Sequence, residues 1–182
     1  MARRIAYTGP PVLTLDQVAF QCRAEPDDLQ PELIEQIIIP GVTAQAESKT
    51  GAAIRAASYE EEWPATYPSG HSLDVGQVVA VESVMVLGEG AAIPFEGAFE
   101  LSHSGKESCL HFPDGRPAGR LRICYQAGVN LSTYPGVLSW LLMAAETAFT
   151  HRGLMVAGQS LAEIPSSFVD HLLADITVPP RF

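Results

Sequence analysis

Histidine and cysteine side chains gather in one stretch of the sequence, at His103, Cys109 and His111, with His71 and Cys124 further away. Zinc and related metals bind imidazole nitrogen and thiolate sulfur, and Cys109 and His111 would share one face of a strand. The stretch has neither C-x-x-C nor H-x-x-x-H spacing, and His103 lies in a Ser-His-Ser-Gly sequence typical of an exposed loop. A half-buried strand face explains these residues better, so we expect no metal and no cofactor, with a small metal-binding hydrolase module as an alternative.

Three consecutive acids, Glu60, Glu61 and Glu62, form a second candidate for chemistry. General acid–base catalysis needs carboxylates that a cleft holds in different environments. Consecutive residues of a strand alternate between its two faces, so we interpret this run as a solvated edge whose charges discourage wrong strand pairing. Serine, histidine and aspartate all occur, but the sequence has no G-x-S-x-G, P-loop or G-x-G-x-x-G motif. We therefore predict no catalytic residues and no enzymatic activity.

Basic residues cluster locally at Arg116, Arg120 and Arg122. On a shared strand face they could contact phosphate or an acidic partner, or they could be a solvated face that balances an acidic protein. The whole chain has 21 acidic and 11 basic residues and a net charge of −10. This balance argues against a protein that grips nucleic acid, which needs a basic patch. It fits simple solubility, and it does not argue against a surface past which DNA must slide.

The chain has 182 residues, of which 47% are hydrophobic, enough for one domain with a sizeable core. Its apolar runs are shorter than the ~20 residues that a bilayer span needs, and no apolar stretch follows Arg3-Arg4 as in a signal peptide. We therefore expect no membrane partner. The three cysteines are an odd number without paired spacing, which favours reduced thiols and synthesis in the cytosol.

The pattern of elements predicts an α+β fold, a small helical bundle from the N- and C-terminal segments with a β-rich insert. Residues 1–182 are expected to form a single domain, with helical parts at 13–51 and 135–175, the insert at 52–128, and extended arms at 1–12 and 176–182. Thr14 is suited to cap a helix over 14–24, because its hydroxyl can accept a bond from an orphaned backbone N–H. A second helix is expected over 28–50, ending at Thr50-Gly51, and later helices over 135–151 and 166–174.

Within the insert, short β-prone runs are separated by Gly, Pro and Ser. The expected strands are residues 54–63, 76–87, 95–102, 108–112 and 119–125. Gly88-Glu89-Gly90 reads as a turn that closes a hairpin between residues 84–87 and 92–95. Pro94 would hold the second arm of this hairpin to the edge of a sheet, because proline has no N–H to donate.

The order of these pieces resembles the head–tail connector (adaptor) proteins of tailed bacteriophages, in their long form with a β-rich insert. Each matching piece is short, and their shared order and spacing along nearly the whole chain carry the resemblance. The pieces are Pro11-Val12, Thr14-Leu15, Arg23, Asp27-Asp28, Leu33-Ile34, Ala46-Glu47-Ser48-Lys49-Thr50-Gly51, Trp63-Pro64, Val78, Val81, Val84, and residues 121–128, 135–152 and 169–173. Pro40-Gly41 is a departure, since the family usually continues this helix unbroken, and it puts a straight helix in doubt.

The resemblance implies a structural virion protein in the neck between capsid and tail, assembled in the host cytoplasm. It implies a homo-oligomeric ring, typically dodecameric, that binds the portal protein and a tail or stopper protein and lets DNA pass through its channel without specific binding. Another neck or tail-completion protein is the alternative in the same class. The helices would then pack subunits together, and the helix over 135–151 is hydrophobic nearly all round, so it is either covered by its own chain or meets a neighbour. The packing candidates are Leu33, Ile34, Ile37, Ile38, Trp140 and Met143.

The C-terminal residues form a proline-containing tail with a terminal aromatic. Such tails can dock onto a partner by strand addition or by filling a pocket, or they can simply fray. In the connector family the C-terminal part engages the portal, which favours docking. The candidates for this contact are Val178, Pro179, Pro180, Arg181 and Phe182.

Overall fold

A computed structural model describes residues 1–88, 90–151 and 170–179. Its contacts divide the chain into two compact units, which we describe separately. Unit 1 comprises Met1–Pro10, Gly51–Val129 and Ile176–Phe182, and unit 2 comprises Pro11–Thr50 and Asn130–Asp175. Helices and antiparallel sheets are both present, so the predicted α+β class is confirmed.

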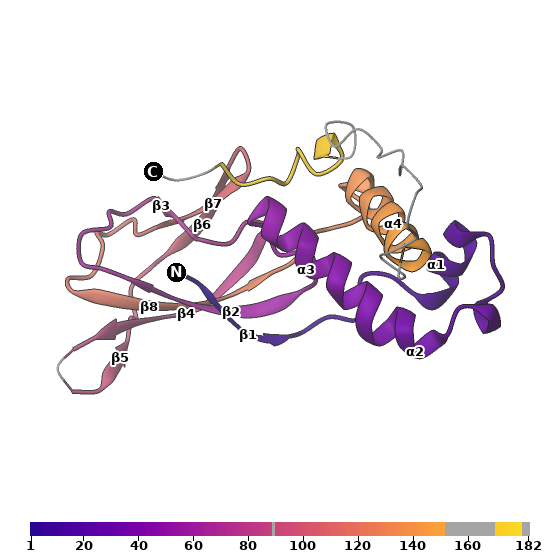
Figure 1. Cartoon of the computed structure of the whole chain (residues 1–182). Helices are drawn as coiled ribbons and strands as arrows, with labels where there is room; N and C mark the ends of the chain where they lie inside the picture. The colour runs from indigo at the N-terminus through magenta and orange to yellow at the C-terminus, as the bar shows by residue number, and fades with distance from the viewer. Residues whose placement is uncertain (89, 152–169, 180–182) are drawn as a thin grey trace. The chain divides into compact units, whose positions relative to one another are not determined.

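Unit 1 is built from two antiparallel sheets (Figure 1). The larger sheet has the strand order β1-β2-β8-β4-β5 and the smaller one β3-β7-β6. The strands are β1 (Arg3–Tyr7), β2 (Ala57–Trp63), β3 (His71–Ser72), β4 (Val78–Leu87), β5 (Ala92–Pro94), β6 (Glu100–Ser104), β7 (Glu107–His111) and β8 (Arg120–Ala127). Buried residues of both sheets form one core, which includes Trp63, Leu73, Leu110, Leu121 and Tyr125.

The register of the central strands explains which side chains reach this core. Strands β2 and β8 pair from Ala57↔Ala127 to Trp63↔Leu121, and both alternate buried and less buried residues. This alternation is the expected consequence of a strand with one face on a core. Residue 61 of β2 is therefore on the same face as Trp63 and faces inward.

The predicted hairpin is present, since β4 pairs with β5 from Met85↔Pro94 to Leu87↔Ala92. Strand β5 is the last strand of its sheet, so Pro94 is at an edge as expected. The strand expected over residues 95–102 begins later than expected: β5 ends at Pro94, and the next strand, β6, spans Glu100–Ser104. Gly97 lies in the segment between them, and glycine weakens a strand because it is costly to order and offers no side chain to pack.

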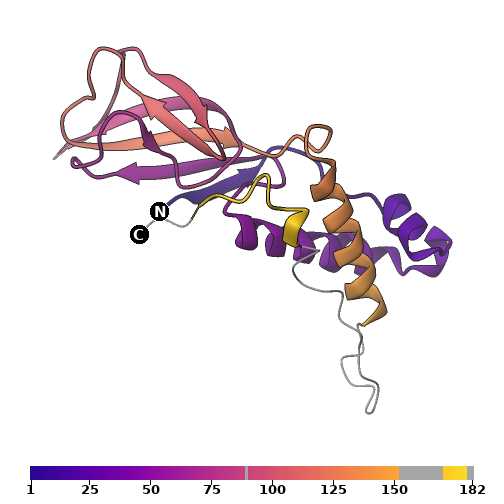
Figure 2. The same ribbon diagram turned by 90° about the horizontal axis from the view of Figure 1, so that it is seen from above.

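Unit 2 is helical. Its helices are α1 (Leu15–Cys22), α2 (Pro31–Leu33), α3 (Ile39–Thr50) and α4 (Pro135–Thr150), with a 3-10 turn at Pro26–Asp28 and a π-helical turn at Ile34–Ile38 between α2 and α3. Helix α4 packs against α1 and α3 (Figures 1 and 2). Gln21 Nε2 donates to Glu146 Oε2 over 2.7 Å, which ties α1 to α4.

Local sequence determines several of these boundaries. The Thr14 hydroxyl accepts from the Gln17 N–H, and the Gln17 side chain accepts from the Thr14 N–H, so the predicted cap is a complete capping box. Pro135 occupies the first turn of α4, where its missing N–H has no helical partner. Helix α3 ends at Thr50, and Gly51 follows with φ +67°, as a left-handed helix stop requires.

Pro40 does not end the second helical segment. The chain is helical from Pro31 to Thr50, and the π turn at Ile34–Ile38 comes just before Pro40. A proline inside a helix removes one donor and crowds the carbonyl one turn earlier. A π turn widens the helix at that position, which is how the segment accommodates the proline. Of the helix expected over residues 166–174, residues 166–169 lie outside the described residues, whereas 170 and 171 are helical and 172–174 form a turn.

Candidate functional site

The His/Cys stretch does not converge on one point in unit 1. His103 Nδ1 lies 3.3 Å from Ser108 Oγ, and Cys109 Sγ lies 3.6 Å from Ser72 Oγ. Cys109 is buried, whereas His111, two residues along β7, is exposed. Within the described residues, no three His, Cys, Asp or Glu side chains are grouped so that they could hold a metal ion. The described geometry therefore offers no support for the metal-binding alternative.

The structure corrects the expectation that Glu60, Glu61 and Glu62 form a solvated edge. Strand β2 lies inside the five-stranded sheet, between β1 and β8, and Glu61 is only 2% exposed. Its carboxylate accepts from Trp63 Nε1 over 2.6 Å, from the Asp74 backbone N–H over 2.9 Å and from Tyr125 Oη over 3.0 Å. A buried carboxylate is tolerated when donors surround it, so Glu61 organises the interior of unit 1.

Burial also changes the acidity of this cluster. Loss of solvent raises the pKa of the Glu61 carboxyl above its ordinary value, although the hydrogen bonds from Asp74, Trp63 and Tyr125 act in the opposite direction. Burial, followed by the nearby Glu61 carboxylate, raises the pKa of Tyr125 as well. Such perturbed groups can mark an active site, but Glu61 is buried and its carboxylate accepts hydrogen bonds from Trp63, Tyr125 and the Asp74 backbone. The arrangement is suited to holding strands together.

On the opposite face of the same strands, acids and arginines form ion pairs. Arg122 lies 3.0 Å from one Glu62 oxygen and 3.7 Å from Glu60, and Arg120 contacts the other Glu62 oxygen at 2.5 Å. Arg3 of β1 pairs with Glu60 at 3.1 Å. The hydrogen bond from Arg122 is the main reason that the pKa of Glu62 is lowered. Arg120 and Arg122 therefore share a strand face, as expected, and their charge is directed to β2.

Arg116 has a different role from the other two arginines. Its guanidinium donates to the carbonyl oxygens of Pro64 at 2.8 Å, Pro117 at 2.7 Å and Gly119 at 2.9 Å. It thus fixes the turn that precedes β8. The three arginines predicted as a cluster are engaged with their own unit.

The six predicted packing residues of unit 2 fall into two groups. Ile34, Ile38 and Trp140 are buried inside the chain itself. Leu33 and Met143 are half-buried, and Ile37 is 63% exposed. Only the second group therefore offers surface to another molecule. Leu33 and Ile37 also line a shallow depression of about 640 Å³ with Gln30, Pro31, Glu32 and Gln36.

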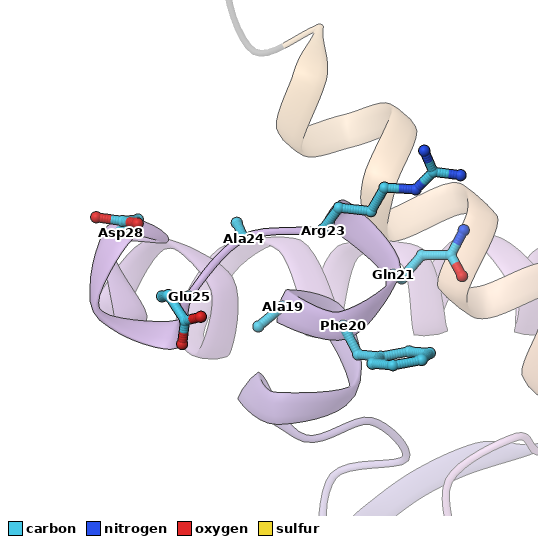
Figure 3. A pocket seen from close by; sticks show the side chains of 7 residues that line it. All are labelled: Ala19, Phe20, Gln21, Arg23, Ala24, Glu25 and Asp28. Atoms are coloured by element: carbon cyan, nitrogen blue, oxygen red, sulfur yellow. The ribbon is translucent and has the colours of Figure 1, made fainter.

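Sequence reasoning missed Phe20, which is 89% exposed and is the most exposed large apolar side chain among the described residues of unit 2. Phe20 lies beside an open hollow of about 750 Å³ at the end of α1, shown in Figure 3. The other lining residues are Ala19, Gln21, Arg23, Ala24, Glu25 and Asp28. The signal was present in the sequence, because Phe20 falls outside the apolar stripe of Leu15, Val18, Ala19 and Cys22 that covers the core face of α1.

The C-terminal docking candidates are only partly described. Val178 is half-buried and Pro179 is exposed, while Pro180, Arg181 and Phe182 lie outside the described residues. Val178 packs closely on unit 1: a Cβ placed on Gly76 would lie 2.5 Å from Val178 Cγ2, and one on Gly51 would lie 3.4 Å from Val178 Cβ. Glycine at position 76 thus makes room for this side chain. Up to Val178 the segment is part of unit 1.

No helix within residues 1–88, 90–151 and 170–179 has the length and apolar character needed to cross a membrane. No protein-family model matches the chain, and no curated protein matches it. Solved structures, in contrast, do match the chain. A chain in the virion of a native gene transfer agent (GTA) particle has a TM-score of 0.76 and 17% identity, covering 100% of this chain and 97% of that one.

Two further matches come from the necks of such particles. A chain in the neck of an empty GTA particle, computed with C6 symmetry, has a TM-score of 0.74 and 14% identity. A chain in the neck of a native GTA particle, computed with C12 symmetry, has a TM-score of 0.68 and 15% identity. Both matches again cover 100% of this chain and 97% of the other. At these identities the likeness establishes a shared fold over the full length.

Proposed function

We propose that this chain is a structural protein of the neck of a phage-like particle, a head–tail connector whose copies form a ring. The observation that carries the proposal is the full-length likeness to GTA neck and virion chains, two of them from symmetric neck assemblies. The connector-like order of sequence pieces supports it independently. A ring of typically twelve copies would bind the portal protein on one side and a tail or stopper protein on the other.

The features of the described surface suit such a role. The chain is strongly acidic, with a net charge of −10, and its arginines at 116, 120 and 122 are engaged within unit 1. A channel lined by such a protein repels phosphates, so DNA passes without binding specifically. The protein would act through geometry, with no cofactor and no catalytic step, in a virion neck assembled in the host cytoplasm.

We assign portal binding to the C-terminal tail. Val178 packs on unit 1, and the residues proposed for the portal contact are those that follow it in the sequence, Pro179, Pro180, Arg181 and Phe182. A short segment that carries an aromatic residue suits a pocket in that partner. The packing of subunits is assigned to the exposed and half-buried residues of unit 2, Leu33, Ile37 and Met143.

The test is whether the chain forms a ring. The purified protein, alone and with its portal protein, is measured by mass photometry, and we expect particles of the mass of a closed ring. A protein that stays monomeric even with its portal would contradict the proposal. Co-purification distinguishes the alternative neck role: a connector retains the portal, whereas a tail-completion protein retains the tail protein and not the portal.

A further inference from the structure

Strand β1 is unusually uncovered for a strand of a sheet. All five of its residues are exposed, whereas its neighbour β2 alternates buried and half-buried positions. It is the outermost strand, so among the residues that the structure describes one of its backbone edges has no neighbouring strand in the sheet. Ile5, 53% exposed, lies at an irregularity in the pairing with β2. An apolar side chain on an exposed edge is a feature that proteins usually cover.

The same strand is basic. Residues 1–10 contain Arg3 and Arg4 and no acid. The Arg4 and Arg55 guanidinium carbons each lie 4.2 Å from the centre of the Tyr7 ring, which holds both charges beside the strand. The Arg3 side chain is 73% exposed even though it pairs with Glu60. The edge therefore combines apolar surface with positive charge.

The hollow beside α1 has the complementary character. Phe20 provides exposed apolar surface at one end, and Glu25 and Asp28 provide carboxylates at the other (Figure 3). Residues 11–35 contain six acids and a single base, Arg23. Arg23 also lines the hollow, and Figure 3 shows its guanidinium extended away from Glu25 and Asp28. The acidic end is thus open to a basic partner.

We propose that the β1 edge of one copy docks into the α1 hollow of the next copy. The proposal rests on the ring proposed above. A closed ring needs a head-to-tail interface, in which two different surfaces of the same chain are complementary. The β1 edge and the α1 hollow are complementary in apolar surface, because Ile5 can meet Phe20. They are also complementary in charge, because Arg4 can meet Glu25 or Asp28. Opposite charges then also fix the orientation of the contact.

Charge reversal tests the proposal. Arg4→Glu and Asp28→Lys are each expected to raise the protein concentration for half-maximal ring formation roughly tenfold, the size of effect expected when like charges face each other. An equimolar mixture of the two variants should recover wild-type assembly, because each reversed surface then meets its opposite. The same holds for one chain that carries both substitutions. Mass photometry of the protein with its portal measures all of these species.

Matched controls separate this contact from general effects of charge and folding. Asp114→Lys and Lys106→Glu change net charge equally at other exposed positions of the chain and should leave assembly unchanged. Phe20→Ala should weaken assembly, whereas Val79→Ala, at an apolar residue 68% exposed on β4, should not. Circular dichroism confirms that each variant is folded, and the recovery in the mixture excludes misfolding as the cause.

The outcomes distinguish this inference from the proposed function. Wild-type rings that tolerate Arg4→Glu and Asp28→Lys would overturn the contact and leave the connector role intact. Variants that keep their rings but lose the portal would also overturn it, because the surfaces would then serve the portal. A wild-type protein that never forms rings, with or without portal, would remove the proposed function and the contact together.

Discussion

Glu61 and Glu62 are adjacent residues whose environments are opposite. Glu61 is enclosed by Trp63, Tyr125 and the Asp74 backbone, and burial raises the pKa of its carboxyl. Glu62 lies on the other face with Arg120 and Arg122, which lower the pKa of its carboxyl. The alternation of a strand is sufficient to produce this difference between neighbours.

Glu61→Gln is expected to change how stability depends on pH. A raised pKa means that the folded state binds the proton on Glu61 more tightly than the unfolded state does. Protonation of Glu61 therefore stabilises the fold at a pH below the pKa that Glu61 has in the unfolded chain. This stabilisation is lost as the pH rises through the pKa that Glu61 has in the folded protein. The unfolding free energy of the wild type should therefore fall relative to that of Glu61→Gln as the pH rises from the ordinary pKa of a glutamate through the raised pKa of Glu61. Urea unfolding at a series of pH values measures this slope.

Glu61→Gln also has an effect that does not depend on pH. The amide presents an NH2 group to one of the buried donors, and an unpaired buried polar group costs about 1–3 kcal/mol. Glu62→Gln is the matched control. Its lowered pKa gives a contribution that is present at neutral pH and lost as pH falls through the folded pKa, so its slope has the opposite sign. Its size is at most about 1 kcal/mol, because the side chain is 38% exposed. If the pH dependence of the unfolding free energy changed in the same direction in both variants, the opposite pKa shifts assigned to Glu61 and Glu62 would be contradicted.

The burial of Glu61 and the exposure of Phe20 mark where sequence reasoning failed at this scale. A run of three acids indicates solvent, and only the register of β2 with β8 brings Tyr125 to the middle acid. Phe20 was visible as an apolar residue off the core face of α1, but no rule of spacing says whether such a residue is covered. Both depend on tertiary contacts between distant segments.

Among the helices, Gly41 is a site at which stability can be raised. It lies inside α3, without a positive φ, and a Cβ added there would meet nothing within 4 Å. Gly41→Ala removes backbone freedom from the unfolded chain and favours the helix, so it should stabilise the protein by about 0.5–1 kcal/mol. Thermal and urea unfolding measure the gain.

Gly136 in α4 is the matched control for this substitution. A Cβ there would lie 2.8 Å from the Leu172 carbonyl oxygen, a backbone atom that cannot move aside cheaply. Gly136→Ala is therefore expected to destabilise the protein despite its equal gain in helix propensity. If both substitutions stabilised the protein, the close packing of α4 on residue 172 would be wrong.

Sequence patterns of neighbouring residues correctly predicted the elements whose boundaries depend on neighbouring residues. The Thr14 cap, the Gly51 stop, Pro135 in the first turn of α4 and the β4–β5 hairpin with Pro94 at an edge all follow from residue chemistry within a few positions. The start of the strand expected at residues 95–102 was wrong because β propensity alone does not show where pairing resumes. The pairing of the N-terminal arm as β1 was also missed, since β2 lies some fifty residues away.

At the scale of the whole molecule, the α+β class was predictable, whereas the membership of both terminal arms in the β-rich unit was not. The two units interleave along the chain, with the helical unit formed by residues on both sides of the β-rich unit. The sequence predicted the order of the helices and of the longer strands, but not β1 and β3. It could not assign Ile34, Ile38 and Trp140 to the chain's own core, because an apolar stripe has the same pattern whether it faces its own chain or a neighbour.

The C-terminal tail gives the last prediction, which concerns the chain in its assembly. Deleting residues 180–182 removes the proposed portal contact and leaves Val178 on Gly51 and Gly76. We therefore expect an unchanged melting temperature and unchanged rings of the connector, but loss of co-purification with the portal. Val178→Asp provides the contrast, because it places a charge in the packing of unit 1 and should lower the melting temperature. A truncated protein that still retains its portal would show that the portal binds elsewhere, and Leu33, Ile37 and Met143 would then be the next surface to test.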